Sequence, residues 1–368
     1  MQLVKTGRDN LLRPLQTVSG IVERRHTLPI LANILIKKEG NAVSFLSTDT
    51  EVQIMTSAEV GSGDDVAATT VAARKLVDIL RALPDAAEVS LTLLDKRLTV
   101  QSGRSRFSLQ TLPASDFPTV AEAQTYETSA ELPQKTLKAL FGMVHFAMAQ
   151  QDIRYYLNGL LLITDGEILS AVATDGHRLA YCQINTGKAH EHSEVIIPRK
   201  TIMELQRLLD DSDEPVRIDI SGNQIKFSFS GIELISKLVE GKFPDYGRVI
   251  PKGYKNRFTL QRESLQRALQ RAAIMTSDKF KGIRCIVEGG SLKISSTNTD
   301  QEEAIEELEI DYGGDSIDIG FNVTYLLDVL GNQKGDSVIV ELGDANSSAL
   351  ITVPDNPDFK YVVMPMRI

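Results

Sequence analysis

The sequence predicts an α+β protein in which one unit of helices and short strands occurs three times. Short motifs recur at a spacing of about 125 residues along the 368-residue chain. Each copy opens with leucines at the spacing of an amphipathic helix. The segments that follow alternate apolar and polar residues, which is typical of antiparallel strands with one buried face. A chain of this length accommodates three domains of ordinary size.

The repeat is carried by short motifs that keep their order along the chain. They are Ser47-Thr48-Asp49 with Ala173-Thr174-Asp175 and Ser296-Thr297-Asn298, Arg74-Lys75 with Arg199-Lys200, and Phe117-Pro118 with Phe243-Pro244. One such match could arise by chance, but several in the same order at one spacing indicate triplication. We therefore predict three domains, at residues 1–125, 126–252 and 253–368.

Two amphipathic helices are expected in each repeat, within residues 8–20, 72–83, 134–150, 198–209, 261–274 and 321–333. Leu137, Leu140 and Val144, for example, share one face of the third helix. Pro14 indicates either the first turn or a kink of the first helix. Between the helices, alternating segments predict strands at residues 41–47, 89–93, 217–220, 225–229 and 337–342.

Positive charge gathers in the predicted helices. The six windows carry a net charge of +8, whereas the whole chain carries −9, so the strands and loops hold the acidic residues. Lysine and arginine are good helix formers, which is one explanation, but glutamate is equally good and is scarce in these windows. If the helices lie on one side of the sheets, that side would attract phosphates without reading bases.

Composition excludes several classes of protein. Because 42% of the residues are hydrophobic, the chain can bury a sizeable core and is not expected to be disordered. No apolar run is long enough for a membrane helix, and the first residues do not resemble a secretion signal, so we expect a cytoplasmic protein. Cys182 and Cys285 are isolated, which excludes a disulfide framework or a cysteine zinc site.

No catalytic constellation is evident. Asp175 and His177 offer an acid and a base, but no motif places Ser105 or Cys182 beside them as a nucleophile. The chain has no phosphate-binding loop of the Gly-x-x-x-x-Gly-Lys type. A loop with two histidines, residues 188–193, could bind a metal adventitiously, but further ligands are lacking and a surface loop is favoured. We expect no enzyme, cofactor or metal; the alternative is a scaffold or hydrolase on the same triplicated frame.

Five segments carry a resemblance to a known family. They are residues 103–107 (GRSRF), 151–159 (QDIRYYLNG), 172–179 (VATDGHRL), 241–246 (GKFPDY) and 361–367 (YVVMPMR). Together they span all three repeats, and the sequence is thereby identified as similar to the bacterial DNA polymerase III beta subunit family, the sliding clamps. The resemblance implies three DNA-clamp domains per subunit and a ring-shaped, head-to-tail homodimer. Helices would line its central hole, antiparallel sheets would form its outside, and duplex DNA would pass through.

The resemblance also implies partners. The ring would tether the replicative polymerase through its alpha subunit, and it would bind the clamp-loader delta subunit and other replication and repair proteins by a short peptide rich in Gln, Leu and Phe. The peptide pocket would comprise Thr174, Gly176, His177, Arg178, Leu179, Pro244, Arg248, Val249, Tyr325, Ser348, Val362, Met364, Pro365, Met366 and Arg367. Read without the resemblance, the last residues are equally well a final edge strand. Asn346 stands where the resemblance leads us to expect an apolar pocket residue.

The remaining assignments concern DNA and the subunit interface. The resemblance implies DNA contacts at Arg25, Arg74, Gln150, Gln151, Tyr156, Arg199 and Lys200. It implies that the ring closes where Ile79, Leu83 and Phe107 of one subunit meet Ile274 and Met275 of the other. For the last two residues, ordinary core packing is the alternative.

Overall fold

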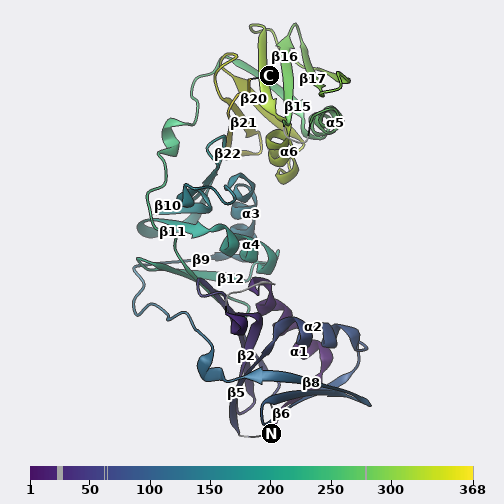
Figure 1. Ribbon diagram of the computed structural model, residues 1–368. Coiled ribbons are helices and arrows are strands. Elements are labelled where there is room, and N and C mark those ends of the chain that lie inside the picture. The colour runs from purple at the N-terminus through teal and green to yellow at the C-terminus, as the bar shows by residue number, and fades with distance from the viewer. Residues whose placement is uncertain (23–27, 62, 64, 278–279, 368) are drawn as a thin grey trace. The chain divides into compact units, whose positions relative to one another are not determined.

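The computed structural model describes residues 1–22, 28–61, 63, 65–277 and 280–367 (Figure 1). The chain forms two compact units, residues 1–137 with 203–238 and residues 138–202 with 239–368. The α-helices of the described residues are α1 (Arg8–Val18), α2 (Ala73–Ala82), α3 (Gln134–Gly142), α4 (Arg199–Leu208), α5 (Arg262–Ala273) and α6 (Val323–Asn332). All six predicted helices are therefore present, and they carry the same net charge of +8.

The third helix is shorter than the expected 134–150. It ends at Gly142 and is followed by a 3₁₀ turn, η4 (His145–Ala147). The His145 Nδ1 atom lies 3.1 Å from the carbonyl oxygen of Phe141 and 3.2 Å from that of Gly142. The ring thereby caps two of the carbonyl groups that have no helical partner at the end of α3.

One twelve-stranded antiparallel sheet runs through the first unit, in the order β1-β6-β7-β8-β5-β2-β3-β4-β14-β13-β12-β9. Its strands are β1 (Gln2–Gly7), β2 (Asn33–Glu39), β3 (Ala42–Thr48), β4 (Val52–Glu59), β5 (Val66–Ala72), β6 (Glu88–Leu94), β7 (Arg97–Ser102), β8 (Ser105–Leu112), β9 (Thr128–Pro133), β12 (Pro215–Ile220), β13 (Gln224–Phe229) and β14 (Ile232–Lys237). The β4–β14 pair joins the first repeat to the second, so the sheet does not stop at the repeat boundary.

The second unit contains a six-stranded and a four-stranded sheet. The six-stranded sheet consists of β10 (Gly159–Thr174), β11 (Arg178–Pro198), β22 (Asn356–Val363), β21 (Ala349–Val353), β20 (Ser337–Leu342) and β15 (Asn256–Gln261), in that order. The other consists of β18 (Glu303–Glu309), β17 (Ser291–Thr297), β16 (Gly282–Glu288) and β19 (Ile317–Asn322). The β11–β22 pair joins the second repeat to the third.

The helices bury the apolar faces predicted for them. In the first unit α1 and α2 pack together and α1 lies on β4, with Leu11 and Leu80 fully buried. In the second unit α5 and α6 pack together (Figure 1). Leu269 and Leu330 are fully buried there. Pro14 lies inside α1. None of the helices in the described ranges is long and apolar enough to cross a membrane.

The recurring motif around Asp49 is a hairpin turn that occurs once in each repeat. The side chains of Asp49, Asp175 and Asn298 each accept hydrogen bonds of 2.7 to 3.0 Å from two backbone N–H groups just downstream. The turns follow β3, β10 and β17, which hold the same position in their repeats. The triplication predicted from the sequence is thus confirmed, and the motif is retained because it builds the same turn.

Candidate functional site

A pocket of about 230 Å³ opens beside the turn between β10 and β11 in the second unit. Most of the side chains around it are apolar. It is lined by Arg154, Tyr156, Leu157, Thr174, Gly176, Arg178, Leu179, Phe243, Pro244, Tyr246, Val249, Val362 and Met364.

The floor of the pocket is fixed by strand register. Leu179 of β11 faces Val362 of β22 across the antiparallel pair, and both side chains are buried. They belong to one apolar cluster with Leu157 and Phe243, which come from the loops on either side. A rigid apolar floor of this kind suits the insertion of apolar side chains from a partner.

The turn at the rim requires glycine. Gly176 has a φ of +88°, and a Cβ atom there would lie 2.9 Å from Nη1 of Arg154. The Arg154 guanidinium is held by Asp152 through bonds of 3.0 Å from Nε and 2.8 Å from Nη2. These bonds lower the pKa of Asp152 to about 2. Thr174 closes the turn by donating a 2.6 Å hydrogen bond to the Arg178 carbonyl.

Two apolar side chains stand exposed at the mouth of the pocket. Met364 is 45% exposed and Val249 is 43% exposed. Met364 is held through its backbone N–H, which donates to the His177 carbonyl at 2.9 Å, while its sulfur lies 3.1 Å from the Ser348 hydroxyl. A flexible, polarizable methionine in this position can adapt to different apolar partners.

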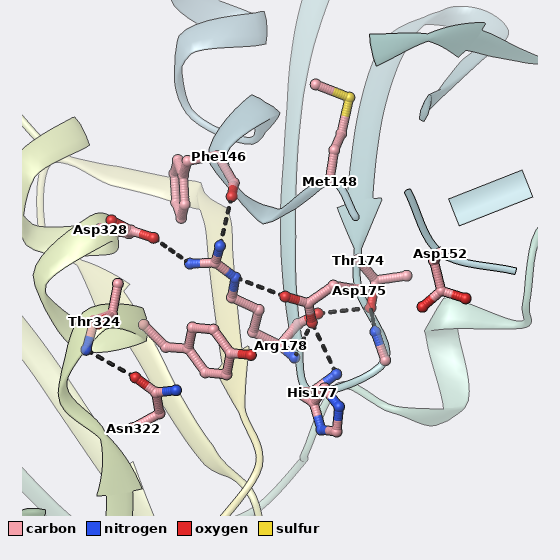
Figure 2. Close-up of polar contacts among 12 residues, drawn as sticks. Phe146, Met148, Asp152, Thr174, Asp175, His177, Arg178, Asn322, Thr324 and Asp328 are labelled. Carbon is pink, nitrogen blue, oxygen red and sulfur yellow. Dashed lines mark hydrogen bonds and ion pairs between the residues drawn. The ribbon is translucent and has the colours of Figure 1, made fainter. Parts of the chain in front are cut away.

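Arg178 links the turn to α6 (Figure 2). Its Nη1 lies 2.6 Å from the Asp328 carboxylate, its Nε lies 3.1 Å from Asp175, and its Nη2 donates to the Phe146 carbonyl at 2.8 Å. The guanidinium carbon lies 4.4 Å from the centre of the Tyr325 ring. Each of the three guanidinium nitrogens therefore has a partner, and these contacts hold the pocket wall that Arg178 forms.

The charge of Arg178 is secured by the same neighbours. Burial by itself lowers the pKa of the guanidinium, but the Tyr361 hydroxyl and the Asp328 and Asp175 carboxylates outweigh burial and raise the pKa. Burial in turn raises the pKa of Tyr361, whose hydroxyl donates to the Tyr325 carbonyl at 2.9 Å. Arg178 is accordingly a permanent cation between the pocket and α6.

A polar hollow of about 490 Å³ lies on the other side of Arg178. It is lined by Phe146, Met148, Ala149, Gln150, Asp152, Asp175, His177, Arg178, Arg199, Tyr325 and Asp328. Arg199, in the first turn of α4, donates to the Met148 carbonyl at 3.4 Å. Burial and the charge of Arg178 lower the pKa of Arg199.

The structure brings together about half of the residues assigned to the pocket from the sequence. Eight of them line it: Thr174, Gly176, Arg178, Leu179, Pro244, Val249, Val362 and Met364. His177 and Tyr325 line the neighbouring hollow. The remaining assigned residues, which line neither space, are Arg248, Ser348, Pro365, Met366 and Arg367.

Five lining residues were not assigned to the pocket from the sequence. They are Arg154, Tyr156, Leu157, Phe243 and Tyr246. A signal was present for two of them, because Phe243 and Tyr246 are aromatic residues between β14 and β15, outside any predicted strand.

The residues assigned to DNA are scattered over several elements. Arg74 is exposed in the first turn of α2, Gln150 and Gln151 are exposed in the loop after η4, and Lys200 is half-buried beside Arg199 at the start of α4. Tyr156 is half-buried and lines the pocket, whereas Gln150 and Gln151 are exposed. Arg25 lies outside the described residues.

β8 and β18 are two of the strands that have an unpaired edge within their own unit. β8 pairs with β7 along its length but with β5 only through Thr111 and Leu112. β18 is the end strand of the four-stranded sheet. Free strand edges favour pairing with another chain.

The two edges have opposite charges. Arg104, directly before β8, and Arg106, within it, are exposed, and neither forms an ion pair with a residue of the described chain. On β18, Glu303, Glu307 and Glu309 are exposed.

Of the residues assigned to the subunit interface, Phe107 lies on β8, and Ile274 and Met275 follow α5, which packs against β18. Ile274, just after α5, is 73% exposed, so core packing does not account for it. Phe107 of β8, Ile79 of α2 and Met275 are half-buried, whereas Leu83 is only 9% exposed and packs mostly within its own unit.

No described group of three or more His, Cys, Asp or Glu side chains could hold a metal ion. His192 lies 3.8 Å from Asp165 and 3.7 Å from Glu194 on the surface of the β10–β11 hairpin. Residues 188–193 belong to strand β11, so the expectation of a surface loop there is wrong.

Comparisons with known proteins cover the whole chain. Family models for the DNA polymerase III beta subunit match at residues 2–121 (N-terminal domain), 131–245 (central domain) and 247–367 (C-terminal domain). The chain is 46% identical to the beta sliding clamp of Pseudomonas putida over 362 residues and 45% identical to that of Escherichia coli over 361 residues, with 98% of each chain covered. A crystal structure of the DNA polymerase sliding clamp from Pseudomonas aeruginosa superimposes with a TM-score of 0.95, at 44% identity and full coverage of both chains.

Proposed function

The chain belongs to the family of the DNA polymerase III beta subunit, the sliding clamps. From that premise we propose which of its surfaces bind partner proteins, a second subunit and DNA. It is a processivity factor for DNA polymerase III and not an enzyme. Its repeated clamp domains consist of helices and antiparallel sheets, and a ring-shaped homodimer fits this family. We propose that the domains span residues 1–125, 126–252 and 253–368, and that the protein works in the cytoplasm.

The pocket is the proposed docking site for partner proteins. The observation that carries this proposal is an apolar floor, Leu179 and Val362, beneath the exposed Met364 and Val249. We infer that a short segment of the DNA polymerase III alpha subunit inserts its apolar side chains here, and that the clamp-loader delta subunit uses the same pocket at another time. A space of about 230 Å³ holds a few such side chains.

The β8 and β18 edges are the proposed subunit contacts. An arginine-rich edge on one subunit would pair with the glutamate-rich edge of a second copy, and the exposed Ile274 would be covered beside Phe107. Because the two edges differ, the contact is head-to-tail, and two such contacts close a ring.

The helices are the proposed DNA-facing surface. The helices carry a net charge of +8 in a chain whose net charge is −9. A surface formed by these helices favours the binding of phosphate groups. Phosphate contacts carry no sequence information, so a clamp that uses them can slide along duplex DNA.

Replacing Arg74 and Arg199 with alanine is expected to weaken DNA association in low salt. Removing one phosphate contact reduces the slope of log affinity against log salt concentration by roughly 0.9, so the slope of the double variant should be shallower by up to ~2. Fluorescence anisotropy of a labelled duplex between low and moderate salt measures the slope.

The matched control replaces Arg257 of β15 and Lys293 of β17, which are exposed on strands, with alanine. It removes the same charge and should leave the slope as in the unmodified protein. Equal slopes for all three proteins would show that Arg74 and Arg199 do not meet phosphate, and the DNA-facing role of the helices would have to be abandoned.

A further inference from the structure

We propose that the pocket continues along β11 and β22 as a ledge that binds an acidic side chain of the partner segment, next to the apolar residues that enter the pocket. The ledge consists of Tyr181, Tyr246 and Lys360. This inference rests on the proposed role of the pocket and adds a determinant of which segments bind it best.

Strand register makes the ledge continuous with the pocket floor. Tyr181 faces Lys360 across the β11–β22 pair, two residues along from the Leu179–Val362 pair. Alternate residues of a strand point to the same face, so both pairs share one surface of the sheet. A peptide whose apolar side chains cover Leu179 and Val362 therefore has its next residues over Tyr181 and Lys360.

The aromatic part of the ledge is built from both sides of the pocket. Tyr246, which lines the pocket, stacks on Tyr181 with ring centres 5.7 Å apart and planes inclined by 23°. Both rings pack against the apolar cluster beneath the pocket and remain half-exposed. Tyr181 is held in place because its hydroxyl donates to Gln183 Oε1 at 2.5 Å.

The cation of the ledge is available to a partner. The Lys360 ammonium lies 5.5 Å from the centre of the Tyr181 ring, and the side chain is half-exposed. In the described part of the chain, no carboxylate lies within ion-pair distance of it. The nearby Asp358 carboxylate instead accepts a 2.8 Å hydrogen bond from Gln183. An ammonium fixed over an aromatic ring without an acidic partner favours a carboxylate as its ligand.

Three labelled peptides test the ledge. Each contains the same Gln/Leu/Phe segment, flanked on both sides by aspartate, by serine or by lysine. For the unmodified protein we expect the aspartate-flanked peptide to bind about two- to fivefold more tightly than the serine-flanked one, despite the net charge of −9. Lys360→Gln should remove this preference and leave the serine-flanked peptide unaffected. Lys360→Glu should shift the preference to the lysine-flanked peptide.

Lys293→Gln removes an exposed lysine from another strand and serves as the control, which should keep the preference. The ledge is overturned if Lys360→Gln retains the preference for aspartate, or if it weakens all three peptides equally. Failure of all three peptides to bind the unmodified protein is a different result, because it would overturn the pocket itself and the ledge with it.

Discussion

Deletion of the chain from Met364 onward is expected to abolish binding of a partner peptide and stimulation of the polymerase, while the dimer stays intact. The deletion removes an exposed apolar side chain from the mouth of the pocket, together with the backbone bond that closes the rim at His177. Covering the exposed half of the Met364 side chain contributes about 1 kcal/mol, roughly fivefold in affinity, and the loss of the pocket rim adds to this. Fluorescence anisotropy with a labelled Gln/Leu/Phe peptide measures this loss.

A single substitution separates the contribution of the Met364 side chain to peptide affinity from that of its backbone bond. Met364→Ala keeps the bond to His177 and should lose only part of the affinity, whereas Lys293→Ala, on an exposed strand position, should lose none. Solution mass should be the same for all of these proteins, because the proposed subunit contacts lie on other strands. Full peptide affinity in the truncated protein would move the partner site away from this tail.

Reversing the charge of the β8 edge is expected to break the ring into single subunits. The double variant Arg104→Glu and Arg106→Glu would set negative charges against the exposed glutamates of β18, and like charges across a strand pair repel. The solution mass should fall from about 81 kDa, twice the chain mass of 40.5 kDa, to that of one chain. Light scattering after size exclusion measures it.

Two further variants separate edge pairing from a general effect of charge. Adding Glu303→Arg and Glu309→Arg to the same chain restores opposite charges and should restore the dimer. Lys37→Glu with Lys252→Glu changes the net charge equally at exposed positions on β2 and in the loop before β15, and this variant should remain dimeric. A dimer that survives reversal of β8 would show that the subunits meet elsewhere.

Much of the fold could be predicted from the sequence because its signals are local. Leucines at helical spacing predicted all six helices, because a helix with one apolar face is stable only when that face packs against a core. The motif around Asp49 was visible because a side chain that accepts two backbone N–H bonds is hard to replace in a hairpin turn. The end of α3 was missed because the bonds of the His145 ring that cap it leave no periodic signal.

The candidate site was only partly predictable because its contacts join distant parts of the chain. Arg178 meets Asp328 across 150 residues of sequence, and no local pattern pairs them. Phe243 and Tyr246 reach the pocket from a loop, where neither helical nor strand periodicity applies. The opposite charges of β8 and β18 predict a subunit contact only when the sheet topology also shows that both strands have free edges.

Retention on DNA of different topology tests the central claim, that this protein encircles duplex DNA as a closed ring. After loading onto a nicked circle, the protein should remain on the DNA, and it should slide off once the circle is cut to a linear duplex. Gel filtration of labelled protein with each DNA measures the bound fraction. A ring held only by its topology predicts retention on the circle and loss from the linear form. Equal retention on both forms would contradict the account, because it would mean direct binding without encirclement.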